Sequence, residues 1–274
     1  DLKFKSNLKF DHLVINYDSA VIKRYLKDYK NLVYFKDGAF DIDYSTNNLS
    51  VIGKTKYSLD KKFTRKISKN LSSNVIQIKC DITYPKKIKQ VFKKIFVKEK
   101  RIDVLINNAG VSFASQKKNQ AYSEKDWIQT INVNLTGSFY CSQEVIKYML
   151  KQRNGSIINI TSINAELGFP RNPAYNASKG GLKMLGKAFA KDWSKFGIRV
   201  NNIGPGYIKT EMTSKRFANK KTRLERQNQT LVGRWGEPDD LIGPCIFLAS
   251  NASKYMTGQD LYIDGGWITN SGLS

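Results

Sequence analysis

Two tyrosines of this chain have a lysine four residues further on, a spacing that can place a phenol beside an ammonium group. The pairs are Tyr57/Lys61 and Tyr175/Lys179. Residues four apart on an α-helix share one face. A neighbouring cation favours the phenolate, and lowering a phenol pKa from ~10 by about three units requires roughly 4 kcal/mol. Such a tyrosine can exchange a proton with a hydroxyl or carbonyl group.

Sequence context separates the two pairs. Tyr175 and Lys179 fall in an expected helix over 174–196, and Ser162 follows the expected strand 156–161. Open α/β sheets bind ligands at the carboxyl ends of their strands, so Ser162 could hold the oxygen with which Tyr175 exchanges a proton. Tyr57 has no comparable neighbour and precedes the next helical pattern. A tyrosine at the core edge beside an exposed lysine is the structural alternative.

Short β-branched runs alternate with helical patterns along the chain. We expect strands at 12–16, 31–35, 74–79, 103–107, 156–161, 198–203 and 260–263, and helices at 19–30, 59–71, 84–99, 124–152, 174–196 and 237–250. Apolar strands between helices are typical of a parallel sheet covered on both faces. The pattern predicts an α/β fold with a doubly wound, mostly parallel, seven-stranded Rossmann-like sheet in a single domain over 1–274. The polar segment 36–58 is expected to be an inserted connection, with a hairpin as one form.

Composition narrows the class of protein. Of the 274 residues 41% are hydrophobic, and no run approaches the roughly 18 apolar residues of a membrane span. Neither a membrane segment nor a secretory signal is expected. Three widely spaced cysteines fit neither a disulfide framework nor a zinc site and favour a reducing, cytoplasmic setting. His12 is the sole histidine, which argues against a metal site and against serine–histidine hydrolysis.

The formal net charge of +23 is unusually high. Such an excess can attract nucleic acid, an anionic membrane or an acidic partner. The lysines are spread along the chain, however, and no basic stretch is interleaved with stacking aromatics. A solvated, lysine-rich surface is therefore favoured over a nucleic-acid site.

Five ordered blocks between about 74 and 266 form a recognisable pattern. They are Asp103-Val104-Leu105-Ile106-Asn107-Asn108-Ala109-Gly110, Asn132-Val133-Asn134-Leu135, Ser162 with Tyr175-Asn176-Ala177-Ser178-Lys179, the run Arg199 to Thr210, and Asp264-Gly265-Gly266. The pattern resembles the short-chain dehydrogenase/reductase family in its classical form. The resemblance implies an NAD(P)-dependent oxidoreductase that interconverts a secondary alcohol and a carbonyl. It also implies a homodimer or homotetramer built through 124–152 and 174–196.

The same resemblance implies roles for particular residues. Tyr175 is the general acid/base, Lys179 lowers its pKa and binds the nicotinamide ribose, and Ser162 orients the substrate oxygen. Asn134 interrupts its helix and holds a water that relays protons to Lys179. The implied cofactor contacts are Asn16, Asp81, Asn107, Ala109, Gly110, Tyr175, Lys179, Pro205, Gly206, Ile208 and Thr210.

The expected phosphate-binding loop departs from the family pattern. The placement that fits puts His12-Leu13-Val14 on the first strand, so Asn16, Ala20 and Ile22 stand in the three glycine positions. The missing glycines would weaken dinucleotide binding roughly a hundredfold or more, although helix N-terminal amides can still bind phosphate. A catalytically impaired binding or scaffold protein is therefore the alternative function. The segment Val51-Ile52-Gly53-Lys54 lies too close to Asp81 to be this loop.

Charged residues bear on the cofactor and the substrate. Lys36 favours NADP and Asp37 favours NAD, so either cofactor fits. The expected substrate segment 207–234 holds two acids and eight basic residues, Lys209, Lys215, Arg216, Lys220, Lys221, Arg223, Arg226 and Arg234. We expect a small-molecule substrate, with an anionic sugar or oxoacyl compound as one hypothesis and Arg223 and Arg226 as the residues that test it. A basic solvated helix is an equally favoured interpretation.

Overall fold

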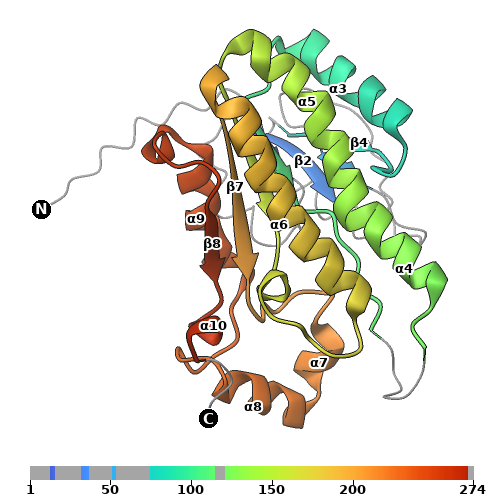
Figure 1. Ribbon diagram of the computed structural model, residues 1–274, viewed down its shortest axis with the longest axis vertical. Coiled ribbons are helices and arrows are strands. Elements are labelled where there is room, and N and C mark those ends of the chain that lie inside the picture. Colours follow the sequence, from blue (N-terminus) through green and yellow to red (C-terminus); the bar gives the residue numbers. More distant parts are fainter. Residues whose placement is uncertain (1–12, 16–31, 37–50, 54–74, 115–120, 271–274) are drawn as a thin grey trace, which may run out of the picture.

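The computed structural model describes residues 13–15, 32–36, 51–53, 75–114 and 121–270. One parallel sheet runs through the molecule, with helices packed along it (Figure 1). The strand order is β3-β4-β2-β1-β5-β6-β7-β8. Their bounds are β1 (Leu13–Ile15), β2 (Leu32–Lys36), β3 (Val51–Gly53), β4 (Val75–Lys79), β5 (Val104–Asn107), β6 (Gly155–Ile160), β7 (Ile198–Pro205) and β8 (Asp260–Ile263). The order, with its crossovers on either side of β1, is the expected Rossmann-like α/β fold.

The sheet corrects the expected strand number. Val51–Gly53 forms β3, so the described sheet has eight strands rather than seven. β3 pairs in parallel with β2 and with β4, which excludes a hairpin between β2 and β3 because hairpin strands are antiparallel. A single β-branched pair, Val51-Ile52, flanked by polar residues is too short a signal to identify this strand from sequence.

The described helices follow the expected order. They are α3 (Pro85–Glu99), α4 (Glu124–Ile131), α5 (Ser138–Gln152), α6 (Pro173–Trp193), α7 (Ser214–Ala218), α8 (Lys220–Asn228), α9 (Ile242–Ala249) and α10 (Trp267–Asn270). Proline opens both α3 and α6, at the position where its missing N–H costs nothing. The expected helices 19–30 and 59–71, the pair Tyr57/Lys61 and the residue Asn16 lie outside the described residues.

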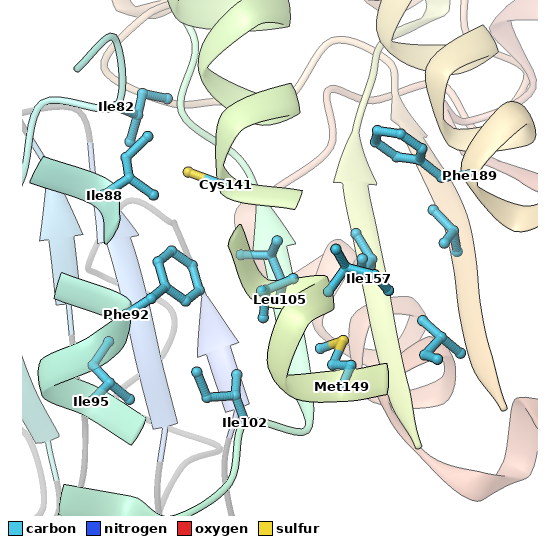
Figure 2. Packing of buried hydrophobic residues seen from close by; sticks show 14 of the residues in the cluster. Ile82, Ile88, Phe92, Ile95, Ile102, Leu105, Cys141, Met149, Ile157 and Phe189 are labelled. Carbon is cyan, nitrogen blue, oxygen red and sulfur yellow. The ribbon is translucent and has the colours of Figure 1, made fainter. Parts of the chain in front are cut away.

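Alternate residues of the central strands enter two hydrophobic clusters on opposite faces of the sheet. Leu105 and Ile157 pack with α3 and α5, where Phe92 and Met149 are fully buried (Figure 2). The neighbouring Ile106 and Ile158 belong instead to the cluster that includes Leu248 of α9. A strand that alternates between two apolar faces must be covered on both. The central strands are therefore rigid supports for the residues that follow their carboxyl ends.

A row of polar side chains crosses the same strands. Asn107, Asn159, Asn202 and Asp260 are successive register partners on β5 to β8. Asn107 Nδ2 donates to Asn159 Oδ1 (2.9 Å), Asn159 Nδ2 to Asn202 Oδ1 (3.0 Å), and Asn202 Nδ2 to Asp260 Oδ1 (2.7 Å). Burial of these amides is tolerated because each finds a partner. The row fixes the register of the strands that carry the site.

The expected long helix 124–152 is divided by one π-helical segment. α4 leads into a π-helix over Asn132–Gly137, and α5 follows. Asn134 lies fully buried in this segment. π-Helical turns widen a helix locally and often occur at functional sites. The interruption implied by the resemblance is therefore present at the expected residue.

Candidate active site

Tyr175, Lys179 and Ser162 lie together beyond the carboxyl end of β6. Tyr175 and Lys179 occupy one face of the first turns of α6, and Lys179 Nζ is 5.6 Å from the centre of the Tyr175 ring. The ammonium group donates to the carbonyl oxygen of Ile160, the last residue of β6, at 2.7 Å. Lys179 is only 3% exposed. A buried cation is thus positioned beside the tyrosine, as the spacing of the pair predicts.

Ser162 is fixed by its own turn. Its backbone is extended and its hydroxyl accepts from Asn164 N (3.2 Å), capping the short 3₁₀-helix Ile163–Ala165. Asn164 Nδ2 in turn donates to Asn176 Oδ1 at 2.7 Å. Asn176 follows Tyr175 directly, so this bond ties the Ser162 turn to the first turn of α6.

The pKa of Tyr175 differs in direction from the sequence expectation. Burial raises this pKa above its ordinary value of 10, while a hydrogen bond with Ser162 and the positive charge of Arg216 lower it. Desolvation disfavours the charged phenolate and is the larger effect here. The expectation that a cation sets the pKa omitted this burial, which cannot be obtained from residue spacing. Tyr175 is therefore a protonated phenol at neutral pH.

Asn134 and Gly110 complete the site next to Lys179. A Cβ atom placed on Gly110 would lie 3.5 Å from Lys179 Nζ and 3.6 Å from Asn134 Oδ1. The Asn134 side-chain amide makes two hydrogen bonds with the main chain of Val111. Its Oδ1 accepts from Val111 N (2.8 Å), and its Nδ2 donates to Val111 O (3.0 Å). Nδ2 also donates to Ser178 Oγ at 3.0 Å. Asn134 therefore fixes the segment after β5 against α6.

The structure separates the expected cofactor contacts into groups. Gly110 adjoins Lys179, whereas the Asn107 amide nitrogen donates to Ser142 Oγ on α5 and to Asn159 Oδ1 on β6. Ala109 is buried in the core cluster. The side chain of Asn107 is thus occupied in holding the sheet.

The remaining expected contacts lie at two other places. The Asp81 carboxylate accepts from Thr83 N and Oγ1 at the turn before α3. Pro205 ends β7, and Gly206 N donates to Ile263 O at 3.0 Å. Ile208 is buried, and Thr210 N donates to Thr213 Oγ1 at 2.9 Å.

The expected substrate segment contains two helices, α7 and α8, beyond the carboxyl end of β7 (Figure 1). Arg226 lies over the rings of Tyr207 (5.2 Å) and Trp267 (5.6 Å), and its Nη1 donates to Gln229 Oε1. Arg223 lies 5.4 Å from the ring of Phe217. Both arginines that the sequence singled out therefore pack against aromatic rings. Arg216, whose charge reaches Tyr175, was not distinguished from the other basic residues.

The described residues fit the nicotinamide end of a dinucleotide. The buried Lys179 ammonium and the Asn134 amide converge on Gly110, where an added Cβ would lie at ordinary contact distances from Lys179 Nζ and Asn134 Oδ1. Donors of this kind suit ribose hydroxyls, which both accept and donate hydrogen bonds. The expected phosphate loop after Ile15 lies outside the described residues. In the described part of the chain, no helix has the length and apolar character needed to cross a membrane.

Comparisons with known proteins agree with this site. The sequence model of the enoyl-(acyl carrier protein) reductase family matches residues 49–268. A 3-oxoacyl-(acyl-carrier-protein) reductase of Thermotoga maritima is 42% identical over 188 residues, or 69% of this chain and 75% of the relative. A 2-dehydro-3-deoxy-D-gluconate 5-dehydrogenase of Bacillus subtilis is 39% identical over 189 residues, or 69% of this chain and 73% of the relative.

A solved structure is similar as well. The crystal structure of a gluconate 5-dehydrogenase of Burkholderia cenocepacia in complex with NADP and tartrate has a TM-score of 0.71 at 32% identity. The similarity covers 76% of this chain and 80% of that chain. The match to the family model begins at residue 49, so the expected phosphate loop precedes it.

The sheet, with a serine and a tyrosine–lysine pair beyond its strands, defines a dinucleotide-dependent oxidoreductase. The chain belongs to the short-chain dehydrogenase/reductase family. It is an NAD(P)-dependent enzyme that acts on the CH–OH group, as the resemblance predicted. Tyr175, Lys179, Ser162 and Asn134 are the residues that the structure brings together at the expected site.

Proposed function

We propose that this chain interconverts a secondary alcohol and a ketone on a sugar acid, with NAD or NADP as the hydride carrier. The convergence of Tyr175, Ser162 and Lys179 beyond β6 is the observation that supports the chemistry. The substrate class is supported by the gluconate-type substrates in the names of the relatives. The basic segment 207–234 adds a source of positive charge.

The protein's part of the reaction is to hold an oxygen and to move one proton. In ketone reduction the Tyr175 hydroxyl gives its proton to the carbonyl oxygen, while Ser162 hydrogen-bonds the same oxygen. In alcohol oxidation the proton returns to Tyr175. A bound nicotinamide supplies or accepts the hydride. Protonation of Tyr175 at neutral pH suits the donor role, since a general acid must carry its proton before the step.

Lys179 and Asn134 support this step from behind the tyrosine. Lys179 holds a positive charge beside the phenol that loses its proton, and would bind the nicotinamide ribose. Asn134 is proposed as part of the proton relay to Lys179, and its bonds to Val111 hold Gly110 in place. Asp81, Gly206, Ile208 and Thr210 are proposed to contact the cofactor at the strand ends.

Two assays test the function. Wild-type protein is expected to reduce NAD or NADP with D-gluconate or 2-dehydro-3-deoxy-D-gluconate as substrate. An oxoacyl thioester forms the second arm of the panel, because the reductase relative acts on that class. Activity on the thioester alone would replace the sugar acid as substrate class. Turnover of neither class would contradict the proposal.

The glycine-free segment 15–22 favours one competing function, a binding or scaffold protein with weakened dinucleotide affinity. Titration of the protein with NADH and with NADPH, followed by tryptophan fluorescence, separates the two. Micromolar binding of either cofactor is expected for the enzyme. A fluorescence signal that does not saturate even at millimolar cofactor would favour the binding or scaffold protein.

We also propose a homodimer or homotetramer formed through α4, α5 and α6. Apolar side chains on these helices are exposed in the single chain, with Trp127 at 41%, Ile128 at 49% and Met184 at 61%. Sedimentation equilibrium is expected to give a mass of two or four chains, and Met184→Lys is expected to weaken the assembly.

We propose a cytoplasmic location for the protein. The three free thiols support this proposal, because a reducing compartment keeps cysteines unpaired.

A further inference from the structure

Among the cations of segment 207–234, Arg216 differs from the other arginines in its surroundings. Arg234 pairs with both oxygens of Asp240 (2.7 and 2.9 Å), Arg226 packs on Tyr207 and Trp267, and Arg223 packs on Phe217. Arg216 is exposed, and within the described ranges its guanidinium has neither a hydrogen-bond acceptor nor an acidic partner nor an aromatic ring against it. No residue of the described part of the chain therefore competes with an anion for its donors.

The helix that carries Arg216 is held in place by a series of aromatic contacts. The ring of Phe217 on α7 meets Trp235 edge-on (5.3 Å between centres), and Trp235 meets Tyr207 (5.3 Å). Tyr207 meets Phe169 at 6.4 Å. Phe169 O accepts from Asn176 Nδ2 at 2.8 Å, next to Tyr175. This series runs without a break from α7 to the first turn of α6.

Electrostatic evidence agrees with that placement. The charge of Arg216 lowers the pKa of two half-buried phenols, Tyr175 and Tyr207, although desolvation raises both on balance. The direction of this effect agrees with the position of α7 beside the first turn of α6, which rests on the aromatic contacts of Phe217.

We propose that Arg216 binds the carboxylate of the substrate while Tyr175 and Ser162 hold the reacting oxygen. This inference rests on the proposed sugar-acid function and names the residue that selects that class. Arginine suits the task because its planar guanidinium can bind both oxygens of a carboxylate. Arg223 and Arg226, which the sequence had suggested, instead pack on the rings of Phe217, Tyr207 and Trp267.

The experiment compares an acid with its neutral counterpart. Arg216→Gln is assayed with NADP or NAD on D-gluconate and on D-glucitol, which has CH₂OH in place of the carboxylate. We expect KM for gluconate to rise about tenfold to a hundredfold, as for loss of a charge-assisted hydrogen bond. We expect kcat/KM for glucitol to stay within roughly twofold of the wild-type value, once the change in the pKa of Tyr175 is corrected for. The ratio of kcat/KM between the two substrates removes any effect of Arg216 on that pKa, because such an effect is common to both.

Two further variants serve as controls. Lys221→Gln removes an exposed charge from the neighbouring α8 and is expected to leave the ratio unchanged. Arg216→Lys is expected to restore part of the ratio, since it keeps the charge but loses the planar fork. An unchanged ratio in Arg216→Gln, or an equal change in Lys221→Gln, would overturn the proposal.

Calorimetric binding of gluconate to the NADP complex separates this inference from the proposed function. Wild type that binds gluconate without turning it over, with binding lost in Arg216→Gln, would support the carboxylate site and contradict the proposed reaction. If wild type turns over gluconate, and wild type and Arg216→Gln bind gluconate with equal affinity, the proposed reaction would stand and Arg216 would have no part in it. Wild type that does not bind gluconate would overturn the inference.

Discussion

At the scale of the residue, the reactivity of Tyr175 is set by opposing environments. Burial raises its pKa, and the Ser162 hydrogen bond and the Arg216 charge lower it. Lys179 holds its ammonium between the tyrosine ring and the carbonyl of Ile160. Desolvation of the phenol is the larger of these effects and keeps the proton on Tyr175 at neutral pH.

The pH dependence of alcohol oxidation should report this balance. Oxidation needs the phenolate, so kcat/KM is expected to rise with pH through the pKa of Tyr175. Arg216→Gln and Ser162→Ala each remove an effect that lowers this pKa, so both are expected to move the rising limb to higher pH. Profiles of kcat/KM against pH for wild type and both variants provide the measurement. A limb that moves to lower pH in either variant would contradict the assigned causes.

The spacing of the site residues made most of this arrangement predictable. Tyr175 and Lys179 share a helix face because they are four residues apart, and Ser162 joins them because it follows a strand. The prominence of Arg216 was not predictable. It depends on which of several arginines pack on aromatic rings, and those contacts join residues as far apart as Phe169 and Trp267.

At the scale of the element, the amide row across β5 to β8 fixes register at the site. A shift of one strand by one residue against its neighbour would move the polar side chain of that strand to the opposite, apolar face of the sheet. The row was not predicted from sequence, because its members are about fifty residues apart and meet only through strand pairing. The strands themselves were predictable, since their β-branched runs are long and sharply bounded.

Breaking this row should be costly. Asn159→Leu would leave Asn107 Nδ2 without its acceptor in the row and Asn202 Oδ1 without its donor. Each buried group without a partner costs about 1–3 kcal/mol, so the free energy of unfolding is expected to fall by about 2–4 kcal/mol. Urea denaturation provides the measurement, with the exposed Asn251→Leu as the control. Equal stability of the two variants would show that the row adds nothing.

A glycine under the row offers an independent test. A Cβ atom on Gly186 of α6 would lie 2.3 Å from Asn202 Oδ1 and 2.8 Å from Asn159 Nδ2. Gly186→Ala is therefore expected to destabilise the fold by about 1–3 kcal/mol through overpacking. Most mid-helix glycines gain stability from alanine. A more stable Gly186→Ala protein would contradict the close packing of α6 on the row.

At the scale of the molecule, the three free thiols are removed from solvent to different extents, because Cys80 and Cys141 are buried and Cys245 is half-buried. Burial raises the pKa of Cys80 and of Cys245 to about 12, and that of Cys141 well above its ordinary value. Thiolates are the reactive form, so native protein is expected to react slowly with a disulfide reagent at pH 8 and to release three thiols on unfolding. Rapid labelling of the native protein would contradict this burial.

The dinucleotide site combines a well-defined end with a segment that departs from the family pattern. Lys179 and Asn134 lie against Gly110, whereas Asn16, Ala20 and Ile22 stand where the family has glycines. The fold was predictable as a class because strands and helices alternate regularly. β3 was missed because its signal is only two β-branched residues long.

The central claim is that Tyr175 moves the proton of an NAD(P)-linked redox reaction. Its most direct measurement is NADPH or NADH formation from D-gluconate by wild type and by Tyr175→Phe, after fluorescence titration shows equal cofactor binding by both. We expect wild type to turn over and the variant to lose about 10²–10⁴-fold in kcat, since only the hydroxyl has been removed. A Tyr175→Phe protein that retains wild-type turnover would contradict the account.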